Sequence, residues 1–518
     1  MSARRSRPKR SRQPTDAAVR SAANRSVDAP KWVQPSPAPG PSTGAIDRPV
    51  VEAEAEAPFS DIRALKHARE APPSGADEAR SPWERAHRLL RAGELRDGMT
   101  ALVDALPGGA TWPAPPQYAA ETLRTLATAS PLLYHSAPSG FAVPEEADAL
   151  YEAALALHAD TSGLVSYVSA LQLLAAVQLG DPARVVRSAA VASALEHVLP
   201  APGTKWFHVA LRTALAQRLA RAPSMHLLRA FPEAVRAHWL ADGAALAQAL
   251  AETSGALVPG PGPTSLMQVL LMAVACDHHA RQGDLYAHAR LAHMLAQAAS
   301  DCPNRHAAAI ACIVDQRDIY AGSLGTRNAS LRRYAAGLET DDPYTGLWIA
   351  RCEVERAKAE RISGDASAAF RRMALLNRSA RQTAAWSAAH FRTLVLTELA
   401  ASALAAAAET AEKGLLLRCA SVAIAAIPGG PVLRLAAGCA WQKGLHVEAL
   451  RHLHVLGSPT GNAQSFWTTH AARIVLGSLR GSVSDIQSAD AAARALRAAG
   501  VIAPTLAARM WLPGIPGE

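Results

Sequence analysis

The chain has 518 residues, 49% of them hydrophobic and 19% charged, which allows a large core and excludes a chain that is disordered throughout. Aromatic residues make up only 5% while Ala is abundant, so closely packed helices are expected and a β-sandwich is not. The formal net charge is +9, and 46 of the 53 basic residues are Arg, a bias that GC-rich coding would also produce.

The N-terminus is a basic arm. Residues 1–13 contain no acidic residue and carry six of the nine net positive charges, on Arg4, Arg5, Arg7, Lys9, Arg10 and Arg12. Such a segment has little apolar surface to bury, so we expect it to be disordered and to contact nucleic-acid phosphates or a nuclear import receptor. A solvated tail without a partner is the alternative. A mitochondrial presequence is disfavoured, because residues 1–30 lack Leu, Ile, Phe and Trp for an apolar helix face.

A linker separates this arm from the folded body. Residues 30–80 are rich in Pro, Gly, Ser and charge, and we assign residues 1–80 as disordered arm and linker. The body is predicted to begin at Ser81, which can cap a helix, with Pro82 at the first helical position and Glu84 completing a capping box.

Glycine turns recur through the body and predict pairs of helices. The steps between the last four of these glycines are 42, 39 and 80 residues, and the last step is twice 40. A fixed spacing of helix, Gly turn and helix is typical of a stacked helical repeat, in which each unit buries its apolar face against its neighbours. The predicted turns lie at Gly93, Gly180, Gly283, Gly325, Gly364 and Gly444.

Small residues flank several of these turns at regular distances. The matching alanines are Ala357 and Ala369 around Gly364, Ala437 and Ala449 around Gly444, Ala86 and Ala105 around Gly93, and Ala192 after Gly180. This pattern resembles the tetratricopeptide-repeat (TPR-like) superfamily, with a period nearer 40 than the usual value of about 34 residues. The resemblance implies an all-α solenoid of stacked antiparallel helix pairs over residues 82–480, in which the small residues let the two helices of a pair approach closely.

Two Pro- and Gly-rich segments interrupt the helical pattern, at residues 252–265 and 425–431. No helix can cross the first, so we expect a boundary there, and the second is interpreted as a loop between repeats. The predicted organisation is an N-terminal helical-repeat half at 81–252, a break at 253–265, a C-terminal helical-repeat half at 266–505 and a tail at 506–518.

The sequence lacks the P-loop, Rossmann, zincin and α/β-hydrolase motifs. The closest approach to a metal-binding pattern is the set Cys276, Asp277, His278, His279, His288 and His293. Adjacent residues on a helix point about 100° apart, so this segment is interpreted as a repeat helix with half-exposed histidines. The six scattered cysteines are expected to be reduced core residues. No catalytic residue, cofactor or metal is predicted, and an enzyme is the least favoured class.

Arginines recur in the predicted second helices of consecutive pairs. If they align, they form a positive stripe that could follow a phosphate backbone, although solvated helix faces carry Arg in any case. The stripe residues are Arg332, Arg333, Arg371, Arg372, Arg378 and Arg381. Tryptophans, in contrast, lie in apolar patterns and are predicted to be core: Trp206, Trp239, Trp348, Trp386, Trp441 and Trp467.

The first functional hypothesis is a non-enzymatic scaffold that binds protein along its helical repeats, with the basic arm for targeting or anchoring. The alternative is a nucleic-acid-associated structural protein of the viral capsid, tegument or nucleoprotein type, whose arm contacts the genome and whose body self-associates. No apolar run approaches 18 residues and no secretory signal is visible, so an intracellular protein of the nucleus or cytoplasm, or of a virion, is expected without a membrane span.

Overall fold

A computed structural model describes most of the chain beyond residue 80. The chain divides into two units, Met1–Gly75 and Ala76–Glu518, and every described residue belongs to the second. The basic arm, the linker, Gly283 and most of the 253–265 segment lie outside the described residues. The described ranges are 81–106, 111–114, 117–133, 143–198, 203–219, 225–240, 242–252, 257, 264–282, 284–317, 319, 324–339, 344–411, 413–427, 432–458 and 466–516.

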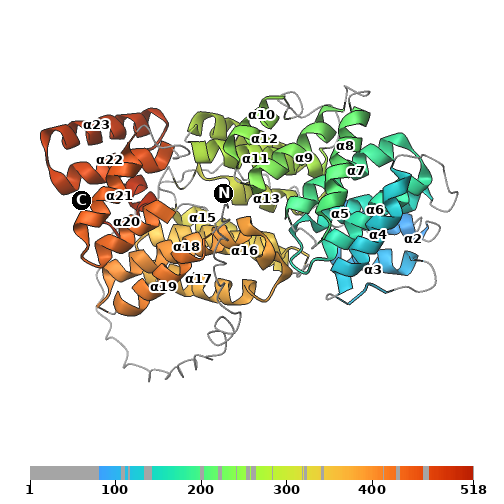
Figure 1. The fold of residues 1–518 in the computed structure, drawn as a ribbon, viewed down its shortest axis with the longest axis horizontal. Coiled ribbons are helices and arrows are strands. Elements are labelled where there is room, and N and C mark those ends of the chain that lie inside the picture. The colour runs from blue at the N-terminus through green and yellow to red at the C-terminus, as the bar shows by residue number, and fades with distance from the viewer. Residues whose placement is uncertain are drawn as a thin grey trace, which may run out of the picture. The chain divides into compact units, whose positions relative to one another are not determined.

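Within these ranges the regular structure consists of 22 α-helices and two short 3-10 helices, and contains no strand, so the predicted all-α class is confirmed (Figure 1). The elements up to residue 252 are α2 (Pro82–Ala92), α3 (Leu95–Ala105), α4 (Tyr118–Leu132), α5 (Pro144–Ala156), η5 (Leu157–Ala159), α6 (Leu164–Leu179), α7 (Pro182–Val198), α8 (Lys205–Leu219), α9 (His226–Trp239) and α10 (Gly243–Glu252). The later elements are α11 (Leu266–Gln282), α12 (Leu285–Asp301), α13 (Ala307–Val314), α15 (Leu324–Glu339), α16 (Gly346–Ile362), α17 (Ala366–Ala380), η7 (Ala384–Ser387), α18 (Ala389–Glu409), α19 (Lys413–Ala425), α20 (Val432–Gln442), α21 (His446–Gly457), α22 (Phe466–Arg480), α23 (Val483–Ala498) and α24 (Pro504–Trp511).

The first described helix begins where the capping signal predicts. Ser81 Oγ accepts a hydrogen bond from the Glu84 backbone N–H at 3.2 Å, and Glu84 Oε2 accepts one from the Ser81 N–H at 3.2 Å. Pro82 occupies the first helical position, where its missing N–H costs no helical hydrogen bond. The helix ends at Gly93, whose left-handed backbone has a φ of 81°.

Three further predicted glycine turns end a helix, and one predicted turn lies inside a helix. Gly180, Gly364 and Gly444 have φ values of 73°, 93° and 78°, the left-handed conformation that ends a helix at low steric cost. The prediction for Gly325 is wrong, because this residue lies inside α15, one position after Leu324 begins that helix. Glycine is tolerated there, since the N–H groups of the first turn have no intrahelical partner.

The predicted small residues lie between paired helices. Ala357 and Ala369 are fully buried where α16 packs on α17, and Ala437 and Ala449 are fully buried where α20 packs on α21. Ala86 and Ala192 are also buried, whereas Ala105 is partly exposed. Methyl groups at these positions allow close approach of the helix backbones, which explains how an Ala-rich chain with few aromatic residues builds a dense core.

The hydrophobic core continues across the predicted break at 253–265. One cluster of buried residues contains Phe231 and Val235 of α9 together with Leu270 and Leu271 of α11. Helices α9 and α11 pack directly on each other, and α5 also contacts α11. The two predicted halves therefore share a core within one compact unit.

Helix α18 is the one helix among the described residues that is long and apolar enough to cross a membrane by length and composition. However, 67% of its apolar window is buried inside the protein, and α18 packs against α16, α17, α19 and α20. It also carries the buried Glu398, which is ion-paired to Arg361. These contacts are those of a core helix of a folded protein.

Residues 506–516 lie within the segment predicted as the tail, 506–518. They belong to α24 and the segment that follows it, and α24 packs on α22 and α16. Arg361 donates a hydrogen bond to the Met510 carbonyl at 3.2 Å, and Gln442 donates to the Gly514 carbonyl at 2.5 Å. The C-terminal segment thus accepts hydrogen bonds from the buried Arg361 of α16 and the partly buried Gln442 of α20.

Candidate functional site

The predicted basic stripe divides in the structure. Arg332 and Arg333 are exposed on α15, and Arg371 and Arg378 are exposed on α17. The residues predicted to form the nucleic-acid or import contact, in the arm, lie outside the described residues. The structure therefore describes the residues of the predicted arginine stripe but not those of the basic arm.

Arg372 is not available to a phosphate backbone. Its Nε and Nη2 atoms donate to the Glu360 carboxylate at 2.9 and 2.6 Å, and its Nη1 donates to Glu353. The hydrogen bonds that Arg372 donates to Glu360, and then the one to Glu353, raise the pKa of its guanidinium against the opposing effect of burial. This residue joins α17 to α16 and does not extend a stripe.

Exposed apolar side chains occur on three second helices, α17, α19 and α21. Their exposed fractions range from 49% to 85%, far above those of the core. We refer to these five side chains together as the α17–α21 face: Leu375, Leu415, Val422, Val447 and Val455. Each helix nevertheless packs its other side inward, because Ala369, Ala420 and Ala449 are fully buried.

The α17–α21 face is also basic. Helices α17 and α19 contain five Lys or Arg residues and no Asp or Glu, and α21 contains a single Glu. Neighbouring helices of this set approach one another: burial raises the pKa of the Cys419 thiol on α19, and the charge of Arg381, directly after α17, partly opposes this effect. Lys443, just before α21, donates to Ser421 of α19 at 3.0 Å.

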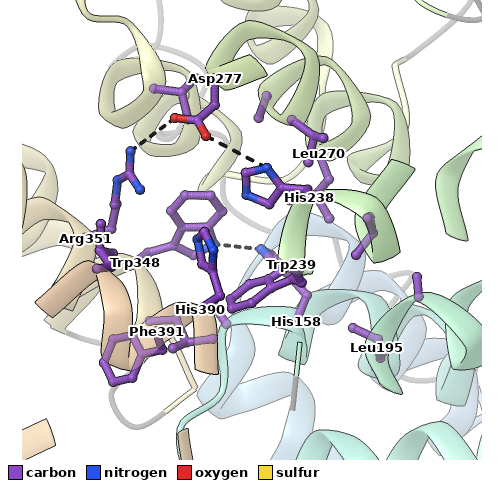
Figure 2. Close-up of a pocket in the computed structure, with 18 of the residues that line it drawn as sticks. His158, Leu195, His238, Trp239, Leu270, Asp277, Trp348, Arg351, His390 and Phe391 are labelled. Carbon is purple, nitrogen blue, oxygen red and sulfur yellow. Dashed lines mark hydrogen bonds and ion pairs between the residues drawn. The ribbon is translucent and has the colours of Figure 1, made fainter. Parts of the chain in front are cut away.

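A cavity of about 130 Å³ lies inside the body, lined by seven elements (Figure 2). Helices α9 and α11 each contribute one face at helical spacing, with Phe231, Val235, His238 and Trp239 from α9 and Leu270, Ala273, Val274 and Asp277 from α11. Helix α16 contributes Leu347, Trp348 and Arg351, and α18 contributes His390, Phe391 and Leu394. The remaining lining residues are His158 and Ala159 of η5, Ala194 and Leu195 of α7, and Val314 of α13.

One wall of the cavity is polar. Figure 2 shows the Asp277 carboxylate between Arg351 and His238, with Oδ1 3.3 Å from Arg351 Nη2 and Oδ2 3.8 Å from His238 Nδ1. The His390 ring lies beside them, its centroid 5.1 Å from that of His238 and 4.6 Å from that of Trp239. The opposite charges of Asp277 and Arg351 offset each other at this wall.

His158 is held neutral on the floor of the cavity. The Leu155 carbonyl, 2.8 Å from Nδ1, can only accept a hydrogen bond, so Nδ1 carries the proton. Nε2 then accepts a hydrogen bond from the Trp348 indole N–H at 2.6 Å. Burial lowers the pKa of His158 to about 4, and the hydrogen bond from Nδ1 only partly opposes this effect.

A row of charged side chains continues from the cavity along one face of α16, with Glu355 and Arg361 buried and Arg351 and Lys358 partly buried. The Glu355 side chain is 0% exposed, and its carboxylate lies 3.1 Å from Arg351 Nη2 and 2.9 Å from Lys358 Nζ. Burial alone would raise the pKa of Glu355, but the charges of Lys358, Arg351 and Arg327 outweigh it and lower the pKa to about 2. Glu355 is therefore the central acceptor of a buried ionic network.

The residues between 276 and 293 that resemble a metal-binding pattern contribute packing and polar contacts within the protein instead. Cys276 Sγ lies 3.2 Å from His288 Nδ1, while Asp277 points to Arg351. Burial raises the pKa of the Cys276 thiol, so it is neither a thiolate ligand nor an activated nucleophile at neutral pH. In the part of the chain that the structure describes, no group of three or more His, Cys, Asp or Glu could hold a metal ion.

All six cysteines are free, and four of them are buried, as expected of reduced core residues. Trp467 is buried, and Trp239, Trp348, Trp386 and Trp441 pack partly buried against the core. Trp206 is an exception to the prediction, because its side chain is 53% exposed at the start of α8. The apolar pattern around Trp206 correctly indicates a helix, but the ring lies at the start of that helix, where it is exposed to solvent.

The cavity was not predicted from the sequence. Its polar residues come from five elements and share no local spacing: His158, His238, Asp277, Arg351 and His390. The clearest available signal was the pair Trp348 and Arg351, three residues apart on a helix that otherwise reads as a repeat unit.

Comparisons with known proteins identify no relative: no protein-family model, no curated protein and no solved structure matches this chain.

Proposed function

We propose that this protein is a non-enzymatic scaffold of TPR-like helical repeats, which binds a protein partner through the α17–α21 face. The observation that carries the proposal is the combination of exposed apolar side chains with basic, acid-free helices on consecutive helix pairs. Exposed apolar residues scattered singly need no explanation, whereas a set that repeats from one helix pair to the next indicates an interaction surface. The glycine turns and buried alanines of these pairs support the repeat architecture.

The chemistry of the face favours an acidic, amphipathic partner helix. Leucine and valine side chains can receive the apolar stripe of such a helix, and the surrounding cations can pair with its flanking carboxylates. Arg371 and Arg378 lie on the same helix as Leu375, and Arg418 lies between Leu415 and Val422. A basic partner would meet like charge along two of the three helices.

A designed peptide pair tests this proposal. Two 20-residue helical peptides carry the same leucine stripe, flanked by Glu in one and by Lys in the other, and their binding to the full chain is measured by fluorescence polarisation. We expect the Glu peptide to bind at least tenfold more tightly than the Lys peptide. We also expect the triple variant Leu375→Ser, Val422→Ser and Val447→Ser to lose this preference.

The matched control is the double variant Tyr286→Ser and Ile502→Ser. These two side chains are 85% and 69% exposed but lie outside the α17–α21 face. The control is expected to bind the Glu peptide as the wild type does. Equal affinity for the two peptides, or an equal loss in both variants, contradicts the proposed face.

The alternative function is that of a nucleic-acid-associated structural protein, and the basic arm favours it. If the arm contacts six phosphates, raising the salt concentration from 50 to 200 mM should weaken nucleic-acid binding by about 10³-fold. Deletion of residues 1–30 should then abolish salt-sensitive binding to a duplex, and the remaining body should self-associate. A full chain that binds no duplex at 50 mM salt rules this alternative out.

A further inference from the structure

The interior cavity concentrates the chain's scarce ring side chains. Aromatic residues make up only 5% of the sequence, yet four of the 19 lining residues are Phe or Trp and three more are His. Most of the core is built instead from Ala, Leu and Val. A packing defect in such a core would be expected among these small aliphatic side chains, so the ring-lined cavity calls for its own explanation.

The cavity has the size and walls of a small-ligand site. Its volume of about 130 Å³ is close to that of engineered apolar cavities of about 150 Å³, which stay dry and bind benzene. The rings of Phe231, Trp239, Trp348 and Phe391 supply flat, polarisable surfaces, which suit edge-to-face and offset contacts with another ring. A ring bound in the cavity would add dispersion contacts to the sides of these rings that face the cavity.

The burial of the lining residues indicates the side from which a ligand enters. Leu195, Phe231, Leu270 and Val314 are buried, whereas Trp239, Leu347, His390 and Leu394 are partly exposed. Seven of the nine partly exposed lining residues belong to α9, α16 and α18, so the opening lies on the side of these three helices. Figure 2 shows the labelled His390 and Trp239 side chains, whose ring centroids are 4.6 Å apart.

The charges on the wall restrict the ligand to a neutral molecule. Asp277 and Arg351 already offset each other, and His158 is neutral with both ring nitrogens in hydrogen bonds. A charged ligand would lose its hydration on entering the cavity. The opposite charges on the wall are already paired with other residues, so they would not compensate for this loss.

We propose that this cavity is a binding site for a neutral, single-ring aromatic compound, held between the Phe231, Trp239, Trp348 and Phe391 rings. The site is independent of the α17–α21 face, which lies on the outer surface of other helices.

The test uses benzene as the probe, with benzoate and benzylammonium as charged comparisons, titrated into the full chain by calorimetry and by saturation-transfer NMR. We expect saturable binding of one benzene per chain and at least tenfold weaker binding of both charged compounds. Benzene binding that does not saturate up to its solubility limit overturns the proposal, as does equal binding of the three compounds.

Cavity-filling variants locate the site. Ala273→Leu and Ala194→Leu place extra carbon atoms in the cavity from α11 and α7, and each is expected to weaken benzene binding at least tenfold. Ala336→Leu, at an exposed position of α15, is the control and should bind as the wild type does. Leu195→Ala enlarges the cavity and should retain binding, so the proposal is still tested if a filled variant fails to fold. Wild-type affinity in folded Ala273→Leu or Ala194→Leu, or loss of binding in folded Leu195→Ala, refutes this location.

Discussion

Glu355→Gln is expected to be the most destabilising conservative change on α16. The wild-type carboxylate is 0% exposed and faces Arg351, Lys358 and the buried Arg327. A neutral amide keeps the shape of the side chain but leaves three cations without their common counter-charge. Removing one partner of a buried ionic network costs about 3–5 kcal/mol.

The pKa of Glu355 gives the magnitude independently and predicts its pH dependence. The pKa falls from 4.5 to about 2 on folding, and this shift corresponds to about 3 kcal/mol of stability. Because the folded pKa is depressed, this contribution is fully present above pH 4.5 and is lost as the pH falls towards 2. The stability difference between the wild type and Glu355→Gln should therefore shrink across that window.

The assay is urea-induced loss of the helical circular dichroism signal, recorded for both proteins between pH 7 and pH 3. Glu448→Gln serves as the control, because Glu448 is exposed on α21 and lies 3.6 Å from His452 Nε2 in a surface ion pair. Its effect should stay below about 0.5 kcal/mol. A loss below about 1 kcal/mol for Glu355→Gln at pH 7, or a loss that does not change with pH, refutes this account of the network.

Three further changes test other parts of the fold. Gly438→Ala would place a Cβ 2.1 Å from the Pro513 carbonyl oxygen, so we expect a loss of about 1–3 kcal/mol in urea unfolding. Gly337→Ala, on α15 with no atom within 4 Å of the new Cβ, should instead gain up to about 1 kcal/mol, and equal effects of the two changes would contradict the packing of the C-terminal segment. His158 should show no ring titration by NMR until the pH approaches 4. Since its pKa in the unfolded chain is near 6.5, the stability of the fold should decrease as the pH drops from 6.5 to 4. A folded-state pKa near 6.5 would refute its neutral, buried role. Ser81→Ala removes a helix cap and should speed amide exchange in the first turn of α2 at a cost of about 1 kcal/mol, whereas unchanged exchange would argue against the capping box.

Features set by a few neighbouring residues could be predicted from the sequence. Ser81 and Glu84 cap a helix because both act within one turn, and Gly364 and Gly444 end helices because their positive φ is a local property. Ala357 is buried between paired helices because small residues permit close approach. The same rule gave a wrong prediction for Gly325. A glycine in the first turn of a helix and a glycine that ends a helix look alike in the sequence.

Features set by packing between distant segments could not be predicted. His158 and His390 line one cavity although they are 232 residues apart in the chain. The arginine pattern was visible in sequence, but the pairing of Arg372 with Glu353 and Glu360 depends on how α16 and α17 dock. Such contacts leave no periodic signal in a single sequence.

The C-terminal segment has a consequence for the order in which this protein can be completed during synthesis. Arg361 and Gln442 donate to carbonyls of residues 510 and 514, which the ribosome adds only later. At about 5–20 residues per second, the interval between residue 442 and residue 514 lasts roughly 4–14 s. Until then Arg361 Nη1 and Gln442 Nε2 lack these carbonyl acceptors, so the hydrogen bonding of α16 and α20 is completed only after the last helix has been synthesised.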